Sequence, residues 1–124
     1  MICVDTSSII AYLQGLEGND VTLIDHALLD QVAAFSPVTI TELLSAHNVS
    51  SSLRETLLAI PMLSIQEGFW ERAGLLRAKV LAKGSKAKLA DTLIAQTCLD
   101  HKIPLITRDQ DCQVFKRLGK LHLL

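Results

Sequence analysis

Five acidic residues stand where this chain passes from one expected structural element to the next. Asp5 follows a short apolar run, Glu42 lies in the first turn of an expected helix, and Asp91 opens another helix. Asp109 and Asp111 come directly after a second apolar run. Carboxylate oxygens suit hard cations such as Mg²⁺ and Mn²⁺, which also bind substrate phosphates. The chemistry that these residues favour is therefore metal-assisted hydrolysis of a phosphodiester bond.

The elements that must position these acids alternate between strands and helices. The expected strands are residues 2–4, 35–38, 61–65, 105–106 and 121–123, and a helical pattern fills each longer interval. Parallel neighbours need crossover connections that are usually helical, so we expect a parallel sheet with helices on both faces. This is a single α/β domain over residues 1–124, with three layers and a sheet of four to five strands. Ligands bind beyond the carboxyl ends of the strands in such sheets, where the acids should converge.

The composition predicts a small domain that binds a second protein chain. The chain has 124 residues, of which 49% are hydrophobic and 4% aromatic. That is apolar for a domain of this size, so some apolar surface is expected to meet a second copy or a partner peptide. The odd number of widely separated cysteines supports neither a disulfide framework nor a metal knuckle. No run reaches the roughly 18 apolar residues of a membrane span, and we expect a cytoplasmic protein.

Each acid also has a structural alternative. Thr39 and Glu42 have the spacing of a capping box, and Asp109 or Asp111 can cap the last helix, a contribution of about 0.5–2 kcal/mol. Asp91 is harder to explain in this way, because helical geometry puts it on the apolar side of its helix, where a carboxylate needs a partner.

Taken together, the acids favour a bound cation. Arg108 is the only Lys or Arg expected in these turns, so the converging carboxylates would otherwise repel one another. The hydroxyls of Thr6 and Thr107 are expected to orient a carboxylate or a water molecule, with a local backbone hydrogen bond as the alternative.

Three segments of the chain resemble the motifs of one family: VDTSSIIAYL, PVTITELL and LADTLIAQTCLDHKIPLITRDQD. They are similar to the PIN domain, and most closely to VapC-type toxin ribonucleases of type II toxin–antitoxin pairs, over essentially the whole chain. The resemblance implies that Asp5, Glu42, Asp91 and Asp109 bind Mg²⁺ or Mn²⁺ and cleave RNA endonucleolytically, with Asp111 as an additional acid. It also implies a PIN-like fold, a homodimer and a cognate antitoxin that blocks the site. Segments 12–29 and 43–58 are the expected antitoxin surface.

A run of basic residues is the expected contact for the RNA. Between residues 72 and 90 the chain has Lys and Arg but no acid, and the helical spacing puts several of them on one stripe. Phosphate binding explains this stripe, and a solvated helix face explains it equally well. The predicted RNA-binding residues are Arg72, Lys79, Lys83, Lys86 and Arg108.

Other functions remain open at this point. Cys112 stands where the resembling proteins commonly have Phe, which concerns local packing. The chain also fits a PIN nuclease outside a toxin–antitoxin system, or a non-catalytic PIN-like interaction module whose acids bind an ion or cap helices. A phosphoacceptor domain that uses Asp109 and Asp111 is less favoured, because the first strand lacks the paired acid and the partner lysine of such sites.

Overall fold

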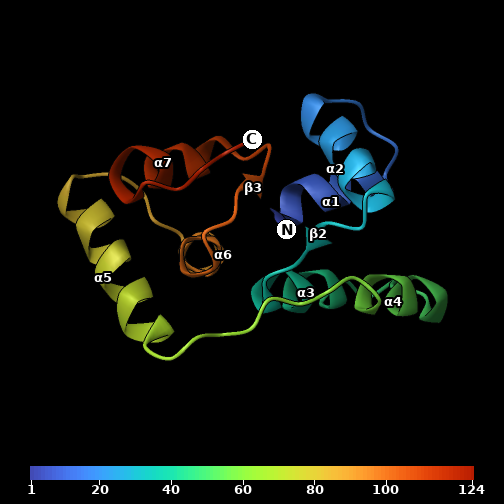
Figure 1. Cartoon of the computed structure of the whole chain (residues 1–124), viewed down its shortest axis with the longest axis horizontal. Helices are drawn as coiled ribbons and strands as arrows, with labels where there is room; N and C mark the ends of the chain where they lie inside the picture. The colour runs from blue at the N-terminus through green and yellow to red at the C-terminus, as the bar shows by residue number, and fades with distance from the viewer.

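Helices cover both faces of a small parallel sheet in the computed structural model, which describes all residues 1–124 (Figure 1). The sheet has the strand order β2-β1-β3, with β1 at Ile2–Val4, β2 at Ala33–Ala34 and β3 at Leu105–Ile106. Both pairings are parallel, and Cys3 lies between Ala34 and Leu105. The expected PIN-like α/β architecture is confirmed.

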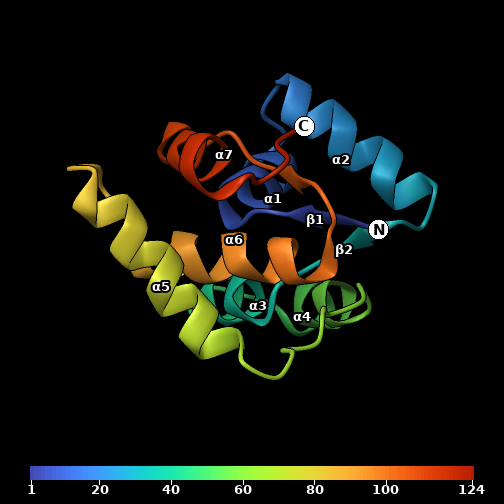
Figure 2. The same cartoon turned by 60° about the vertical axis from the view of Figure 1, so that its left-hand side comes forward.

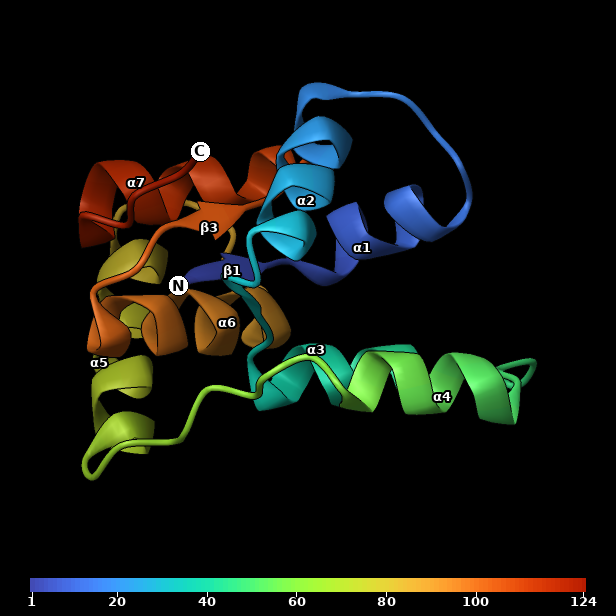
Figure 3. The ribbon, with the colours of Figure 1, turned by 45° about the vertical axis from the view of Figure 1, so that its right-hand side comes forward.

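Seven α-helices and one 3₁₀ turn connect the strands. They are α1 (Thr6–Leu13), α2 (Asn19–Leu29), α3 (Pro37–Leu44), α4 (Ser51–Leu58), α5 (Phe69–Ala82), α6 (Leu89–His101), the 3₁₀ turn η1 (Gln110–Cys112) and α7 (Gln113–Gly119). Figure 2 shows α5 packed against α6, and Figure 3 shows α3 and α4 together on one side of β1. None of these helices has the length and hydropathy that a membrane crossing requires.

The sheet has three strands, and the prediction of four to five was too high. The expected strands at 61–65 and 121–123 each contribute only an isolated bridge, Met62 to Phe35 and Leu123 to Leu105. Pro61 has no N–H to donate and offers only its carbonyl oxygen, which accepts from Phe35 N at 2.9 Å. Both segments therefore lie beside the sheet without extending its ladder.

The prediction of a strand at 35–38 was also wrong, since only Phe35 of that segment pairs, in an isolated bridge. The strand β2 ends at Ala34, and α3 begins at Pro37. Ser36 caps this helix, since its hydroxyl accepts from Val38 N at 3.3 Å. Proline is favoured in the first turn of a helix, where its missing N–H costs nothing, so Ser36-Pro37 starts a helix here.

Two hydrophobic clusters fill the space on the two faces of the sheet. Successive strand residues point to opposite faces, so Cys3 and Leu105 join one cluster while Val4 and Ile106 join the other. The first cluster is completed by α5, α6 and α7, and the second by α1 to α4. All three cysteines are free and buried, and Cys112 belongs to the first cluster.

The sheet delivers several chain segments to one edge. The strands β1 and β3 are parallel and adjacent, so the residues that follow them, Asp5 and Thr107, lie at the same end of the sheet. The first turn of α1 starts at that point. The acids that follow the strands therefore come close together because of the parallel topology.

Replacing Ile106 with Ala should destabilise the protein strongly. Ile106 is fully buried between the sheet and the second cluster, and removal of such a side chain leaves a cavity that costs about 2–5 kcal/mol. Urea unfolding followed by circular dichroism measures the loss. Leu29→Ala is the control, because Leu29 is 74% exposed and should change stability by less than about 0.5 kcal/mol. Equal losses in the two variants would contradict the packing described for β3.

Candidate metal centre

Three carboxylates lie together beyond the end of β3. Asp91, Asp109 and Asp111 each have a ligand atom within 4.8 Å of the corresponding atoms of the other two. Asp91 comes from the first turn of α6, and the other two come from the loop and the 3₁₀ turn after β3. This group of three residues is called the carboxylate cluster below. Asp111, which the family resemblance gave only as an additional acid, is a full member.

Asp91 is the member of the cluster that has a buried oxygen without a hydrogen-bond partner. Only three buried side-chain oxygens in the protein lack a hydrogen-bond partner, and Asp91 Oδ2 is the one that belongs to a carboxylate. Burial raises the pKa of Asp91 to about 6, helped by the negative charges of Asp109 and Asp5. A buried carboxylate oxygen without a partner, next to two further carboxylates, is a donor set that fits a hard divalent cation.

Asp5 is held beside the cluster by two hydroxyl groups. Its side chain is buried, and its Oδ2 accepts from Ser7 Oγ at 2.8 Å and from Thr107 Oγ1 at 2.7 Å. The Thr107 hydroxyl also accepts from Asp109 N at 3.0 Å, so one hydroxyl connects two of the predicted acids. Thr107 thus orients a carboxylate, as the sequence suggested. Ser7 was missed, although its place two residues after Asp5 is typical of a local hydroxyl contact.

Glu42 lies apart from the carboxylate cluster. It is the sixth residue of α3, so the prediction that it occupies the first turn was wrong, and Ser36 replaces Thr39 as the cap. Its side chain is exposed, and Thr6 Oγ1 donates to its Oε1 at 2.6 Å. Thr6 follows Asp5 directly, so this bond ties Glu42 to the end of β1.

Asp109 caps the 3₁₀ turn. Its Oδ1 accepts from Asp111 N at 2.9 Å, so Asp109 caps the turn that precedes α7 and not the last helix itself, whose N-cap is Cys112. The cap uses one oxygen and leaves the other available to the cluster. The hydroxyl of Thr107 also lies 3.8 Å from the buried Cys112 sulfur, so the residue that departs from the family pattern packs against the support of the site.

Lys88 brings a positive charge to the carboxylate cluster. Its Nζ lies 3.2 Å from Asp111 Oδ2, and the carboxylates of Asp111, Asp109 and Asp91 raise the pKa of Lys88. The prediction that Arg108 is the only cation near the acids was therefore wrong. Lys88 was counted only as part of the basic run, although its position at the N-cap of α6 places it one turn from Asp91.

Arg108 is bound to the protein itself. Its Nε donates to Asp20 Oδ2 at 2.8 Å, and its Nη2 donates to Asp20 Oδ1 at 3.0 Å and to the carbonyl of Glu17 at 3.1 Å. The guanidinium lowers the pKa of Asp20 to about 2. A Cβ on Gly18 would lie 2.5 Å from Asp20 Oδ1, so glycine is required there. This ion pair fastens the loop that carries Asp109 to the start of α2.

The predicted basic stripe divides into a bound residue and free ones. Arg72 donates to both oxygens of Asp100, at 2.9 and 2.7 Å, and to the carbonyl of Glu67. Lys79, Lys83 and Lys86 are exposed and form no ion pair. RNA contact by these three lysines stays a prediction, whereas the guanidinium groups of Arg72 and Arg108 already have protein partners.

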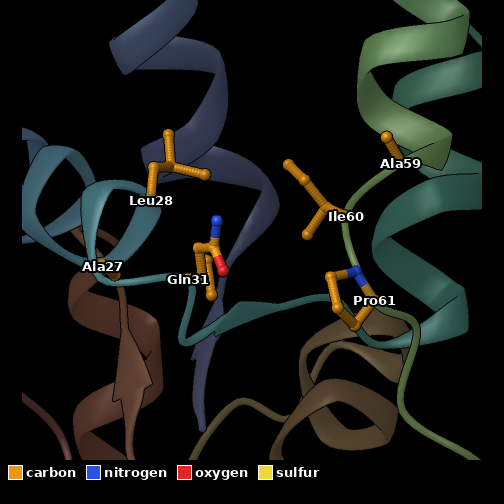
Figure 4. Close-up of a pocket in the computed structure, with 7 residues that line it drawn as sticks. Ala27, Leu28, Gln31, Ala59, Ile60 and Pro61 are labelled. Carbon is orange, nitrogen blue, oxygen red and sulfur yellow. The ribbon is translucent and has the colours of Figure 1, made fainter.

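The largest cavity of the protein is apolar and lies away from these acids. It has a volume of about 390 Å³ between the C-terminal ends of α2 and α4, where Leu28 and Gln31 face Ile60 and Pro61 (Figure 4). This is the amino-end side of β2, opposite the edge that carries the acids. Two smaller hollows border the acids instead: an apolar groove of about 260 Å³ that reaches Glu42 and a polar groove of about 240 Å³ that reaches Asp111.

Comparisons with known proteins agree with this fold. A family model for the PIN domain matches residues 2–121. VapBC2 from Rickettsia felis, bound to a promoter DNA fragment, has 20% identity and a TM-score of 0.75, covering 100% of this chain and 98% of that one. VapBC-1 from nontypeable Haemophilus influenzae has 23% sequence identity and a TM-score of 0.75, and the match covers 100% of this chain and 97% of that one. A toxin–antitoxin complex from Klebsiella pneumoniae has 22% sequence identity and a TM-score of 0.68, and the match covers 100% of this chain and 96% of that one. No curated protein sequence matches.

Asp91→Asn should stabilise the metal-free protein at pH 8. Because the pKa of folded Asp91 is about 6, above its ordinary 3.8, the folded state binds the extra proton and gains stability as the pH falls from 8 through 6. The variant should gain about 1 kcal/mol at pH 8, since Asp91 is only partly buried and solvent screening reduces the full effect of the shift. Its stability should also lack the rise on acidification. Urea unfolding in EDTA between pH 5 and 8 measures both effects.

The exposed Asp30, at the end of α2, supplies the matched control. Asp30→Asn should leave the pH dependence of stability unchanged. A destabilised Asp91→Asn protein with the wild-type pH dependence would show that the Asp91 carboxylate has a structural role.

Proposed function

The chain belongs to the PIN domain family, and from this premise we propose that it is a Mg²⁺- or Mn²⁺-dependent endoribonuclease, the toxin of a toxin–antitoxin pair. The observation that carries this proposal is the buried, unpartnered Oδ2 of Asp91 beside Asp109 and Asp111. Such an arrangement is unfavourable for the folded chain alone and becomes favourable when a cation neutralises it.

Asp91, Asp109 and Asp111 would hold the divalent cation, with Asp5 next to them. When bound, the cation supplies the charge that activates water and stabilises the phosphate as its bond breaks. The ligands are all oxygens, which suits Mg²⁺ or Mn²⁺ and does not suit zinc. Lys88 already pairs with Asp111, so Asp111 would bind the cation more weakly than the other ligands do.

The protein's own contribution is to hold the carboxylates in place before substrate arrives. Thr107 and Ser7 fix one oxygen of Asp5, and Asp109 is fixed by its cap on the 3₁₀ turn. Supports of this kind keep the functional oxygens from turning toward solvent. Glu42 lies apart from the three cation ligands and is tied to the end of β1 through Thr6, so its proposed place is at the margin of the site.

The apolar groove at Glu42 is the proposed binding site of the antitoxin. It lies between α1, α3 and α4, and Ile10 and Leu13 stay 41% and 44% exposed at its wall. Apolar anchors of an amphipathic segment fit a groove of this kind, and a basic side chain of that segment can reach Glu42. The similarity to a solved toxin–antitoxin complex supports an antitoxin as the partner.

A second copy of the chain is the other proposed partner. Large apolar side chains stay exposed on α5 and at the start of α6: Trp70 at 65%, Leu75 at 72% and Leu89 at 60%. Trp70 and Leu89 line one shared hollow, which is separate from the groove at Glu42 and is available for a homodimer contact.

Purified protein should cleave RNA with Mg²⁺ or Mn²⁺ and should stop when EDTA is added. Asp91→Asn and Asp109→Asn should each lower the rate by about 100-fold or more, because each removes a ligand of the cation. Gel analysis of a labelled RNA measures cleavage, and circular dichroism checks folding. The Asp30→Asn control should keep wild-type activity.

Cleavage that survives EDTA, or that survives Asp91→Asn in folded protein, would contradict the proposal of a metal-dependent nuclease. Folded wild-type protein that binds a partner tightly and never cleaves RNA would favour the interaction module. Covalent labelling by acetyl phosphate would favour the phosphoacceptor alternative.

Leu13→Glu should abolish co-purification with the protein encoded by the adjacent gene. A charge placed in the apolar groove must be desolvated when the partner binds, so recovery should fall by about tenfold or more. Tandem affinity purification of the co-expressed pair measures this. Leu29→Glu is the matched control on α2, where the exposed side chain lines no described groove. Equal loss in both variants would contradict the proposed location.

A further inference from the structure

The polar groove beside Asp111 shares only that residue with the proposed cation site. It has a volume of about 240 Å³, and its polar lining comes from Ser85, Lys86, Gln110, Asp111, Gln113 and Arg117. We propose that this groove binds the backbone phosphate of the RNA strand next to the bond that is cleaved. This inference rests on the proposed nuclease function and adds the path of the substrate.

Three separate segments build the groove. The connection between α5 and α6 supplies Lys86, the 3₁₀ turn supplies Gln110, and α7 supplies Arg117. Figure 1 shows this connection running beside α7. Arg77 steadies the connection, since its Nε donates to the carbonyl of Ala87 at 2.8 Å. The groove is therefore formed by tertiary structure, and the helical spacing of the basic run does not predict it.

The charge balance of the groove favours an anion. Lys86 and Arg117 are exposed and take part in none of the three ion pairs of the protein. The one acid of the lining, Asp111, already has Lys88 at 3.2 Å. Two cations without partners thus share one hollow, where a phosphate would relieve their repulsion.

The remaining lining matches a nucleic-acid backbone. Ser85, Gln110 and Gln113 offer hydroxyl and amide donors, the groups that commonly bind phosphate and sugar oxygens. Val114 is the single apolar residue of the lining, which disfavours an apolar ligand or a base-stacking site. The hollow contains no aromatic side chain, so it is suited to reading the backbone.

The position of Asp111 connects this groove to the cleavage chemistry. Asp111 lines the groove and belongs to the carboxylate cluster at the same time. A strand with its scissile phosphate at the cluster therefore has a neighbouring phosphate within reach of Lys86 and Arg117. The basic stripe of α5 lacks this connection, because Lys79 and Lys83 do not line the groove.

The experiment compares two double variants that lose the same charge. Lys86→Gln with Arg117→Gln empties the groove of cations, whereas Lys102→Gln with Lys120→Gln removes two exposed cations that lie outside the groove and form no ion pair. Binding of a short labelled single-stranded RNA is followed by fluorescence anisotropy in EDTA over a range of salt concentrations. Matching melting temperatures for both variants and the wild type confirm that the variants fold.

The slope of log K against log salt should shrink by about 0.7 in the groove variant, because the groove holds one phosphate and each phosphate contact of a single strand contributes about 0.7. The variant that lacks Lys102 and Lys120 should keep the wild-type slope. An unchanged slope in the groove variant, or an equal change in both variants, overturns the inference.

Because the measurement needs no cleavage, the two proposals fail separately. A groove variant that loses RNA affinity in a protein that never cleaves RNA supports the groove and removes the nuclease function. A protein that cleaves RNA with Mg²⁺ while the groove variant binds normally leaves the function intact and overturns the groove.

Discussion

Repulsion among carboxylates is the constraint on which the rest of this structure depends. The parallel topology brings Asp5, Asp91 and Asp109 to one edge of the sheet, where the charges of Asp5 and Asp109 help raise the pKa of Asp91 to about 6. A chain that only had to fold would place such groups apart. The folded state tolerates them because its two hydrophobic clusters bury most of the strand and helix faces around the site.

Hydroxyl groups next to the carboxylates, and ion pairs farther from them, hold these acids in place. Thr107 and Ser7 donate to Asp5, so one oxygen of that carboxylate is satisfied while the other is kept for function. Farther out, Arg108 and Asp20 fasten the loop of Asp109 to α2, and Lys88 offsets the charge of Asp111. Removing any of these supports leaves the acids present but badly oriented, which is a different failure from losing a ligand.

The sequence predicted what depends on local pattern. The ends of apolar runs located Asp5 and Asp109, and the helical position of Asp91 identified an acid that needed a partner. The pairing of Arg108 with Asp20 could not be predicted, because it joins residues 88 positions apart and no periodicity encodes it. The strand at 35–38 failed for a local reason, since a two-residue strand followed by Ser36-Pro37 is too short to show alternation.

The bond between Thr107 and Asp5 has a consequence for the time at which the site comes into existence. It joins residues 102 positions apart, so the first strand carries its acid through nearly the whole synthesis of the chain before the third strand arrives beside it. Contacts of such long range form late, after the loop between them has been closed. A ribosome-bound chain therefore exposes no assembled carboxylate cluster. The cluster can assemble only after the last third of the chain, which supplies Asp91, Asp109 and Asp111, has been made.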